Sequence, residues 1–371
     1  MPRIIYLSSG ESFFIFNEIK MKYVPKIYTV ESVTSGHPDK FCDQVSDAIL
    51  DACLEQDPKS RVAVETMVGH GLVVIMGEVT TNAEVDYEKT ALDVYRDIGY
   101  TSEMKFIVRI MKQSPDIAQG VNVGGAGDQG IMYGFATNET PEYMPKGIVL
   151  VHGLTSGLER LRKSGEVEWL KPDGKAQITI ENERIRTILV STQHAENISQ
   201  KEIRETLIEK LIRPLAGDIS NVEILVNPTG KFVIGAEGGF SADTGLTGRK
   251  IMVDTYGGLI PHGGGCFSGK DPTKVDRSGA YMARFVAKNL VAQGAARECL
   301  VAVAYAIGRA EPLMIEAVNE KGENINGIVR EKFDFKPLSI IEKLDLRKPI
   351  YRKTAAYGHF GRKGFSWERI E

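Results

Sequence analysis

Apolar and polar positions alternate with a period of two along several short segments of this 371-residue chain, and with a helical period along longer ones. Residues 61–68 and 72–81 both show strand periodicity and flank Gly69-His70-Gly71, which predicts a β-hairpin. Residues 42–56 carry an apolar stripe at helical spacing that ends at Asp57-Pro58, which predicts a helix.

The same patterns predict elements along the rest of the chain. Further helices are expected over 83–98, 199–211 and 277–293, and further strands over 104–111, 176–180, 184–191, 222–226 and 299–307. Ser199 and Glu202 form a capping box, while Gly99 and Gly294 follow helix ends. Because strands pair locally and helices stand between them, the pattern favours an α+β fold over a doubly wound sheet.

Composition excludes several classes of function. Hydrophobic residues make up 42% and charged residues 26%, which is ordinary globular usage. The net charge of −3 argues against a general nucleic-acid binder, since binding to a phosphate backbone needs a basic surface. No apolar run approaches the roughly 20 residues of a membrane span, so we expect no membrane partner.

The cysteines and the first residues give further expectations. Cys42, Cys53, Cys266 and Cys299 are scattered without a C-x-x-C pair, which is typical of reduced thiols in a cytoplasmic protein. Residues 1–20 make a poor signal peptide, because acidic residues flank their short apolar run and no small-x-small cleavage site follows. We therefore interpret them as an N-terminal extension without a catalytic part.

The stretch over residues 262–278 carries the strongest chemical signal. Three consecutive glycines let the backbone approach a ligand closely, and Gly269 precedes Lys270, Lys274, Asp276 and Arg277. Cations on a tight glycine loop suit a polyphosphate, and a neighbouring carboxylate suits the metal that such a phosphate carries. The stretch is not a Walker A motif, because Asp271 follows Lys270.

Three other stretches combine glycines with charged residues in the same way: residues 31–40 (ESVTSGHPDK), 125–130 (GAGDQG) and 243–250 (DTGLTGRK). Together with the glycine stretch they resemble the S-adenosylmethionine synthetase family, over nearly all of the chain from about residue 27 to 367. Further similar pieces are 113–117 (QSPDI), 191–194 (STQH), 227–232 (NPTGKF) and 354–361 (TAAYGHFG).

The resemblance implies three similar α+β domains around a pseudo-threefold axis, with boundaries that we place at 21–120, 121–232 and 233–371. It implies that ATP, L-methionine and water become S-adenosylmethionine, phosphate and diphosphate. In this reaction sulfur attacks C5′ of ATP directly, and the tripolyphosphate is then hydrolysed. It also implies two Mg²⁺ per site, K⁺, and a homo-oligomer (a dimer, or dimers paired into a tetramer) with active sites between subunits.

The family's functional residues transfer to matching positions of this chain. The implied catalytic residues are His37, Asp128, Lys175, Arg249 and Lys270. The implied ATP-binding residues are His37, Asp173, Lys175, Lys231, Phe232, Asp243, Arg249, Lys250 and Lys270. The implied methionine-binding residues are Glu78, Gln113, Asp243 and Lys274. The implied metal ligands are Asp39 and Asp276 for Mg²⁺ and Glu65 for K⁺. His37 is expected to act as a switchable cation beside the leaving oxygen.

Several of these residues also fit ordinary structural roles. His37 and Asp276 could cap the helices that follow them, and Glu65 could form a plain salt bridge. Pro172-Asp173-Gly174-Lys175 alone reads as a β-turn. Phe232 could be a core residue instead of an adenine platform, and Glu78 could lie on a solvated strand edge.

Two rival functions and two departures from the family pattern stay open. A kinase could use the same triphosphate cradle and would yield ADP. A catalytically dead homologue would be expected to lack one of His37, Asp39, Lys175 or Asp276, which are all present. The stretch over 113–124 resembles a mobile gate but is short near 121–127, and the loop over 236–242 is longer than usual.

Overall fold

The computed structural model describes residues 5–6, 12–13, 26–112, 124–233 and 240–371. Its strands are β1 (Ile5–Tyr6), β2 (Ser12–Phe13), β3 (Ile27–Val33), β4 (Arg61–Gly69), β5 (Leu72–Thr80), β6 (Lys105–Met111), β7 (Gly130–Thr137), β8 (Leu170–Glu181), β9 (Arg184–His194), β10 (Glu223–Val226), β11 (Gly245–Leu246), β12 (Glu298–Tyr305) and β13 (Met314–Asn319). Its α-helices are α1 (Pro38–Gln56), α2 (Tyr87–Ile98), α4 (Lys146–Lys163), α5 (Gln200–Leu207), α6 (Arg213–Ala216), α8 (Ile251–Asp254), α9 (Val275–Ala292), α10 (Asn326–Lys332) and α11 (Pro337–Lys343). A π-helical turn, Ile208–Ile212, joins α5 to α6, and short 3₁₀ turns lie at Arg352–Thr354 and Ser366–Glu368.

Three sheets organise the chain after residue 26. The N-sheet has the strand order β11-β4-β5-β6, the central sheet β10-β9-β8-β3 and the C-sheet β13-β12-β7. Each sheet packs against one long helix of 18 or 19 residues: α1 on the N-sheet, α4 on the central sheet and α9 on the C-sheet. The described part of the chain after residue 26 therefore consists of three similar α+β units, as the family resemblance implies.

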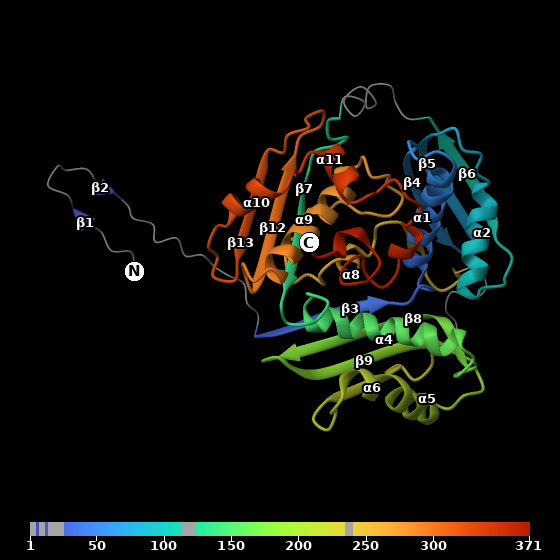
Figure 1. Ribbon diagram of the computed structural model, residues 1–371. Helices are drawn as coiled ribbons and strands as arrows, with labels where there is room; N and C mark the ends of the chain where they lie inside the picture. The colour runs from blue at the N-terminus through green and yellow to red at the C-terminus, as the bar shows by residue number, and fades with distance from the viewer. Residues whose placement is uncertain (1–4, 7–11, 14–25, 113–123, 234–239) are drawn as a thin grey trace.

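The three units exchange strands in a ring (Figure 1). Strand β3 precedes α1 in the chain, yet it pairs antiparallel with β8 in the central sheet. Strand β7 precedes α4 but pairs with β12 in the C-sheet, and β11 precedes α9 but pairs with β4 in the N-sheet. Local pairing alone therefore does not describe the fold, because every sheet takes one edge strand from another third of the chain.

Local expectations from the sequence agree with the structure at most turns and caps. Strands β4 and β5 form the expected hairpin, in which Gly71 adopts a positive φ of 78°. The Ser199 hydroxyl accepts the N–H of Glu202 at 3.2 Å, which confirms that cap. The helix predicted to begin at residue 83 begins instead at Tyr87, because the Asp86 side chain caps it.

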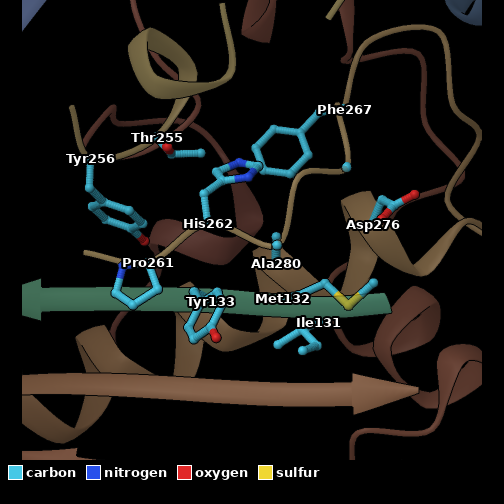
Figure 2. A pocket seen from close by; sticks show the side chains of 12 residues that line it. Ile131, Met132, Tyr133, Thr255, Tyr256, Pro261, His262, Phe267, Asp276 and Ala280 are labelled. Carbon is cyan, nitrogen blue, oxygen red and sulfur yellow. The ribbon is translucent and has the colours of Figure 1, made fainter. Parts of the chain in front are cut away.

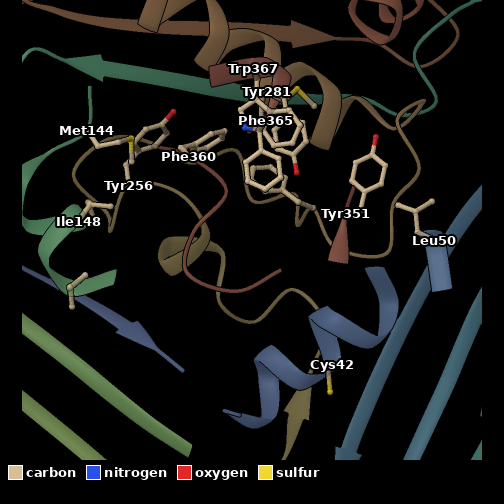
Figure 3. Packing of buried hydrophobic residues seen from close by; sticks show 14 of the residues in the cluster. Cys42, Leu50, Met144, Ile148, Tyr256, Tyr281, Tyr351, Phe360, Phe365 and Trp367 are labelled. Carbon is tan, nitrogen blue, oxygen red and sulfur yellow. The ribbon is translucent and has the colours of Figure 1, made fainter. Parts of the chain in front are cut away.

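The C-terminal segment completes the core beside α9 (Figure 3). Trp367 is fully buried, stacks on Tyr281 with ring centroids 3.8 Å apart and donates its indole N–H to the His359 carbonyl at 2.9 Å. The Arg277 guanidinium lies 4.2 Å from the ring centroid of Tyr351. These contacts fix the first turns of α9, which carry charged residues of the candidate site.

Candidate active site

His37 occupies the N-cap of α1 and is 2% exposed. Its Nδ1 accepts the N–H of Asp39 at 3.1 Å, so the ring proton must lie on Nε2. That Nε2 is buried and has no hydrogen-bond partner among the described residues. The capping role is confirmed and does not exclude the predicted functional role, because the cap uses one ring nitrogen and leaves the other as an N–H donor without a partner among the described residues.

The charge state of His37 differs from the sequence-based expectation. Burial, together with the ammonium groups of Lys250 and Lys175, lowers the pKa of His37 to about 3. Without ligand, His37 is thus a neutral donor at physiological pH instead of a switchable cation.

Asp39 lies beside two of the predicted phosphate contacts. Its Oδ2 lies 2.6 Å from Lys250 Nζ, and its Oδ1 lies 3.7 Å from Arg249 Nε and accepts the N–H of Leu246 at 2.9 Å. Burial acts to raise the pKa of Asp39, but the hydrogen bonds from Lys250 and Leu246 lower it below its ordinary value. Asp39 is therefore ionised at neutral pH and can serve as a cation ligand.

Asp173 supplies a second buried polar atom without a partner. Pro172 to Lys175 lie inside β8 at a register shift opposite β9, so the β-turn alternative is wrong. Asp173 is 6% exposed, and its Oδ1 makes no hydrogen bond with the described residues. Burial raises the pKa of Asp173 to about 7, which Lys175 partly opposes and Asp243 reinforces.

The glycine stretch brings Lys270 and Asp276 together at 2.6 Å. Burial lowers the pKa of Lys270, but the carboxylate of Asp276, with a contribution from Asp128, raises it above its ordinary value. A Cβ built on Gly265 would lie 2.0 Å from Asp276 Oδ1, so only glycine allows this close approach. Asp276 lies in the first turn of α9, whose N-cap is Lys274, so the cap alternative for Asp276 is wrong.

Asp276 also lines a small pocket with His262, Phe267 and Met132 (Figure 2). Its volume of about 20 Å³ holds little more than one water molecule. This pocket is too small for ATP, so it is not itself the nucleotide site.

Two clusters thus emerge from the predicted residues. The first holds His37, Asp39, Asp173, Lys175, Asp243, Arg249 and Lys250, and the second holds Asp128, Lys270 and Asp276. They adjoin where Cys266 packs against Gly248, at which a Cβ would lie 2.6 Å from the Cys266 Cβ. The structure therefore assembles ten of the predicted residues around two neighbouring loops.

Six predicted residues belong to neither cluster, although Glu65 lies near the junction between them: burial raises the pKa of the Cys266 thiol, and the charge of Glu65 adds to this effect. Glu65 and Glu78 occupy the outer face of the N-sheet, and no ion pair of Glu65 occurs within the described residues, so nothing there supports its salt-bridge alternative. Lys274 pairs with the buried Asp271. Lys231 pairs at the surface with Glu196 at 2.9 Å. Gln113, the gate over 113–123 and the loop residues 236–239 lie outside the described residues.

Phe232 is half-buried, lies outside the buried hydrophobic core, and is held by His194. The His194 N–H donates to the Phe232 carbonyl at 3.0 Å, and the Phe232 N–H donates to His194 Nε2 at 3.1 Å. Because His194 Nδ1 lies 2.8 Å from the Ala195 carbonyl, the ring proton is on Nδ1 and Nε2 is the acceptor. No role is predicted for His194 itself, although it belongs to the family-like piece 191–194.

Metal binding by this site would rely on single carboxylates. No group of three or more His, Cys, Asp or Glu side chains with metal-binding geometry occurs among the described residues. Asp39 and Asp276 each offer one carboxylate beside a lysine that is predicted to bind phosphate. This arrangement suits Mg²⁺, an ion usually bound through one or two carboxylates plus substrate phosphates.

None of the helices in the described part of the chain combines the length and apolar character needed to span a bilayer.

Three family profiles match the chain in succession: S-adenosylmethionine synthetase N-terminal domain over residues 25–119, central domain over 123–232 and C-terminal domain over 237–369. A relative from Pseudothermotoga lettingae, named S-adenosylmethionine synthase, is 52% identical over 93% of this chain and 97% of its own length. One from Petrotoga mobilis with the same name is 51% identical over 93% and 96%.

The cation-lined loops and these matches define an ATP-dependent transferase. The chain belongs to the S-adenosylmethionine synthetase family. The sequence-based predictions of family, α+β fold class and enzymatic activity are thereby confirmed.

Proposed function

We propose that the chain converts ATP, L-methionine and water to S-adenosylmethionine, phosphate and diphosphate. The observation that carries the proposal is that two buried polar atoms, His37 Nε2 and Asp173 Oδ1, have no hydrogen-bond partner among the described residues and lie near the cations of Lys175 and Lys250. Buried polar atoms in folded proteins normally have hydrogen-bond partners, so these two are best explained as atoms that bind a ligand. One offers a donor to an anion and the other an acceptor to a sugar or amine.

Each group has a distinct role in this reaction. Methionine sulfur attacks C5′ of ATP, and the C5′–O bond breaks so that the triphosphate leaves with the bonding electrons. His37 Nε2–H donates a hydrogen bond to the departing oxygen, while Lys175, Arg249, Lys250 and Lys270 bind the phosphates. Holding sulfur and C5′ in line supplies most of the remaining rate enhancement, so no protein nucleophile is needed.

Asp39 and Asp276 would hold Mg²⁺, which when bound neutralises charge on the triphosphate. Each of these carboxylates is paired with a lysine at 2.6 Å in the ligand-free chain. These lysines hold the carboxylates in place, and they can turn to the phosphates when the ligand binds. Glu65 is proposed as a K⁺ ligand, because it is an exposed carboxylate without an ion pair in the described residues.

The reaction itself can be tested with purified protein, ATP, methionine, Mg²⁺ and K⁺. We expect S-adenosylmethionine, phosphate and diphosphate, with inversion at C5′ in ATP that is stereospecifically labelled there. Formation of ADP would support the kinase alternative instead. Net retention, or an adenosyl-enzyme that can be trapped, would contradict direct displacement.

We further propose that two copies of the chain share each site. The outer face of the N-sheet exposes Met67, Met76, Ile107 and Met111, the last to 70%. Isolated proteins rarely expose such a flat apolar face, and obligate interfaces are usually large and apolar. Glu65 lies opposite Met76 and Glu78 beside Met111, so a second copy on this face would reach both carboxylates.

Subunit mixing tests this assembly. His37→Ala and Lys270→Ala should each be inactive, and mixed dimers should regain about one active site in two if the residues come from different chains. Other pairs among the site residues should be mixed if this pair shows no recovery. Full activity of a monomer, established by sedimentation at assay concentration, would refute the shared site.

A further inference from the structure

Helix α1 carries four aspartates at a spacing of four residues: Asp39, Asp43, Asp47 and Asp51. Side chains at this spacing lie above one another on one helix face. Each of the four accepts backbone N–H groups from the C-terminal third of the chain. The bonds are Leu246 N to Asp39 at 2.9 Å, Gly248 N to Asp43 at 2.8 Å, Gly269 N to Asp47 at 2.8 Å, and Tyr351 N and Arg352 N to Asp51 at 2.8 and 2.9 Å.

Two of these bonds reach the loops that carry Arg249, Lys250 and Lys270. Gly248 directly precedes Arg249 and Lys250, and Gly269 directly precedes Lys270. Both glycines have positive φ, 81° and 80°, which other residues adopt only with strain. A Cβ on Gly269 would also lie 1.9 Å from the Val64 carbonyl oxygen. The backbones of both loops therefore pack closely against their surroundings. Asp43 and Asp47 bind them at Gly248 and Gly269, one residue before Arg249 and Lys270.

Buried cations hold the two carboxylates in place. Asp43 and Asp47 are both fully buried. Lys40 Nζ lies 2.9 Å from Asp43 Oδ2, and Arg277 binds Asp47 through two bonds of 2.7 Å. Asp43 gives one oxygen to Lys40 and the other to the Gly248 N–H, whereas Arg277 binds both oxygens of Asp47 and the Gly269 N–H shares Oδ1 with it. Charge-assisted bonds of this kind are the strong ones.

We propose that Asp43 and Asp47 are positioning residues that hold the two cation-bearing loops in register with the N-terminus of α1. Asp43 sets the place of Arg249 and Lys250, and Asp47 sets the place of Lys270. The proposal rests on the phosphate-binding role of these cations given above. Because Asp39 stands on the same helix face, α1 fixes the spacing between a metal-binding carboxylate and the phosphate contacts.

Asp43→Asn is the most direct test. Lys40 retains Asp254 as a partner, so neutralising Asp43 leaves one cation with one carboxylate, and the variant is expected to fold. The asparagine cannot accept both the Gly248 N–H and a bond from Lys40 in the way the carboxylate does. We expect the KM values for ATP and for tripolyphosphate to rise by about tenfold or more, since displacements near 1 Å can cost about a hundredfold. The KM for methionine should stay unchanged.

Asp51→Asn is the matched control. It removes the same type of bond from the same helix face, but its target loop at Tyr351 and Arg352 carries none of the proposed substrate contacts. We expect its polyphosphate KM values to remain at the wild-type level, even where denaturation shows a comparable loss of stability. Equal kinetic effects in both variants would overturn the positioning role.

A second variant, Asp43→Glu, keeps the charge beside Lys40 but moves the carboxylate oxygens away from Gly248. If Asp43 served only to balance the charge of Lys40, this variant would bind tripolyphosphate normally, and that result would also overturn the proposal. A raised KM for tripolyphosphate in a folded Asp43→Glu supports it. Failure of the underlying reaction is distinguishable, because wild-type protein would then neither form S-adenosylmethionine nor hydrolyse tripolyphosphate.

Discussion

The buried carboxylate of Asp173 should lower the stability of the ligand-free protein while serving its activity. Burial raises the pKa of Asp173 from 3.8 to about 7. Between these values the folded chain binds one proton more than the unfolded chain, so stability falls as the pH rises through this window and stays low above it. At 1.4 kcal/mol for each pKa unit, the penalty reaches about 4 kcal/mol above pH 7.

Asp173→Asn removes this penalty, because the amide stays neutral at every pH. Urea denaturation of both proteins at pH 5 and pH 8 measures the effect. The stability of the variant relative to wild type should be greater at pH 8 than at pH 5 by about 2–3 kcal/mol. Its KM for ATP should rise, while hydrolysis of tripolyphosphate, which lacks the nucleoside, should persist. A stabilised variant with impaired ATP binding would show that Asp173 lowers the stability of the protein but is needed for its function.

Asp271→Asn is the control for this experiment. Asp271 is equally buried but has partners in Thr273 and Lys274, which lower its pKa against the effect of burial. Its stabilising effect is complete at both pH values, so the loss in Asp271→Asn should be the same at pH 5 and pH 8. A stability difference for Asp173→Asn that does not change with pH would refute the reasoning about Asp173.

Three further outcomes test the proposed site. Asp39→Asn and Asp276→Asn should each lower kcat by about a hundredfold to a thousandfold at ordinary Mg²⁺ concentration, while circular dichroism shows that the protein stays folded. Normal turnover of either variant would mean that the substituted residue is not a metal ligand. Glu65→Gln should weaken activation by K⁺, measured as rate against K⁺ concentration, and an unchanged response would assign Glu65 elsewhere. His194→Leu should raise the KM for ATP but leave tripolyphosphate hydrolysis intact, because it removes the ring acceptor of the Phe232 N–H and touches no phosphate contact; equal effects on both substrates would exclude this role.

Local rules predicted the local structure well. The hairpin β4–β5, the Ser199 cap and the end of α2 at Gly99 follow from turn and cap chemistry within a few residues. The helix predicted to begin at residue 42 begins instead at Pro38, because the charged Asp39 and Lys40 in the first turn obscure the apolar stripe that Phe41 already continues. This turn is buried anyway, since Lys40 pairs with Asp43 and Asp254.

Strand pairings and ion pairs between distant parts of the chain could not be predicted from the sequence. Nothing in β3 indicates that it pairs with β8, because an edge strand in any sheet would show the same residues. The lysine partners of Asp39 and Asp276 could not be inferred for the same reason, since both pairs depend on how the loops meet α1 or α9. The aspartate spacing along α1 was visible in the sequence, but acidic residues every four positions are also typical of a solvated helix face.

The ring of exchanged strands has a consequence for synthesis on the ribosome. The central sheet can close first, once β10 ends at Val226, whereas the N-sheet waits for β11 at Gly245. Strand β7 emerges by Thr137 but finds its partner only when Glu298 has been made. During that interval its open edge is available to other nascent chains, and such long-lived edges favour aggregation. The C-sheet, and with it the native fold, can therefore be completed only when about the last hundred residues leave the ribosome.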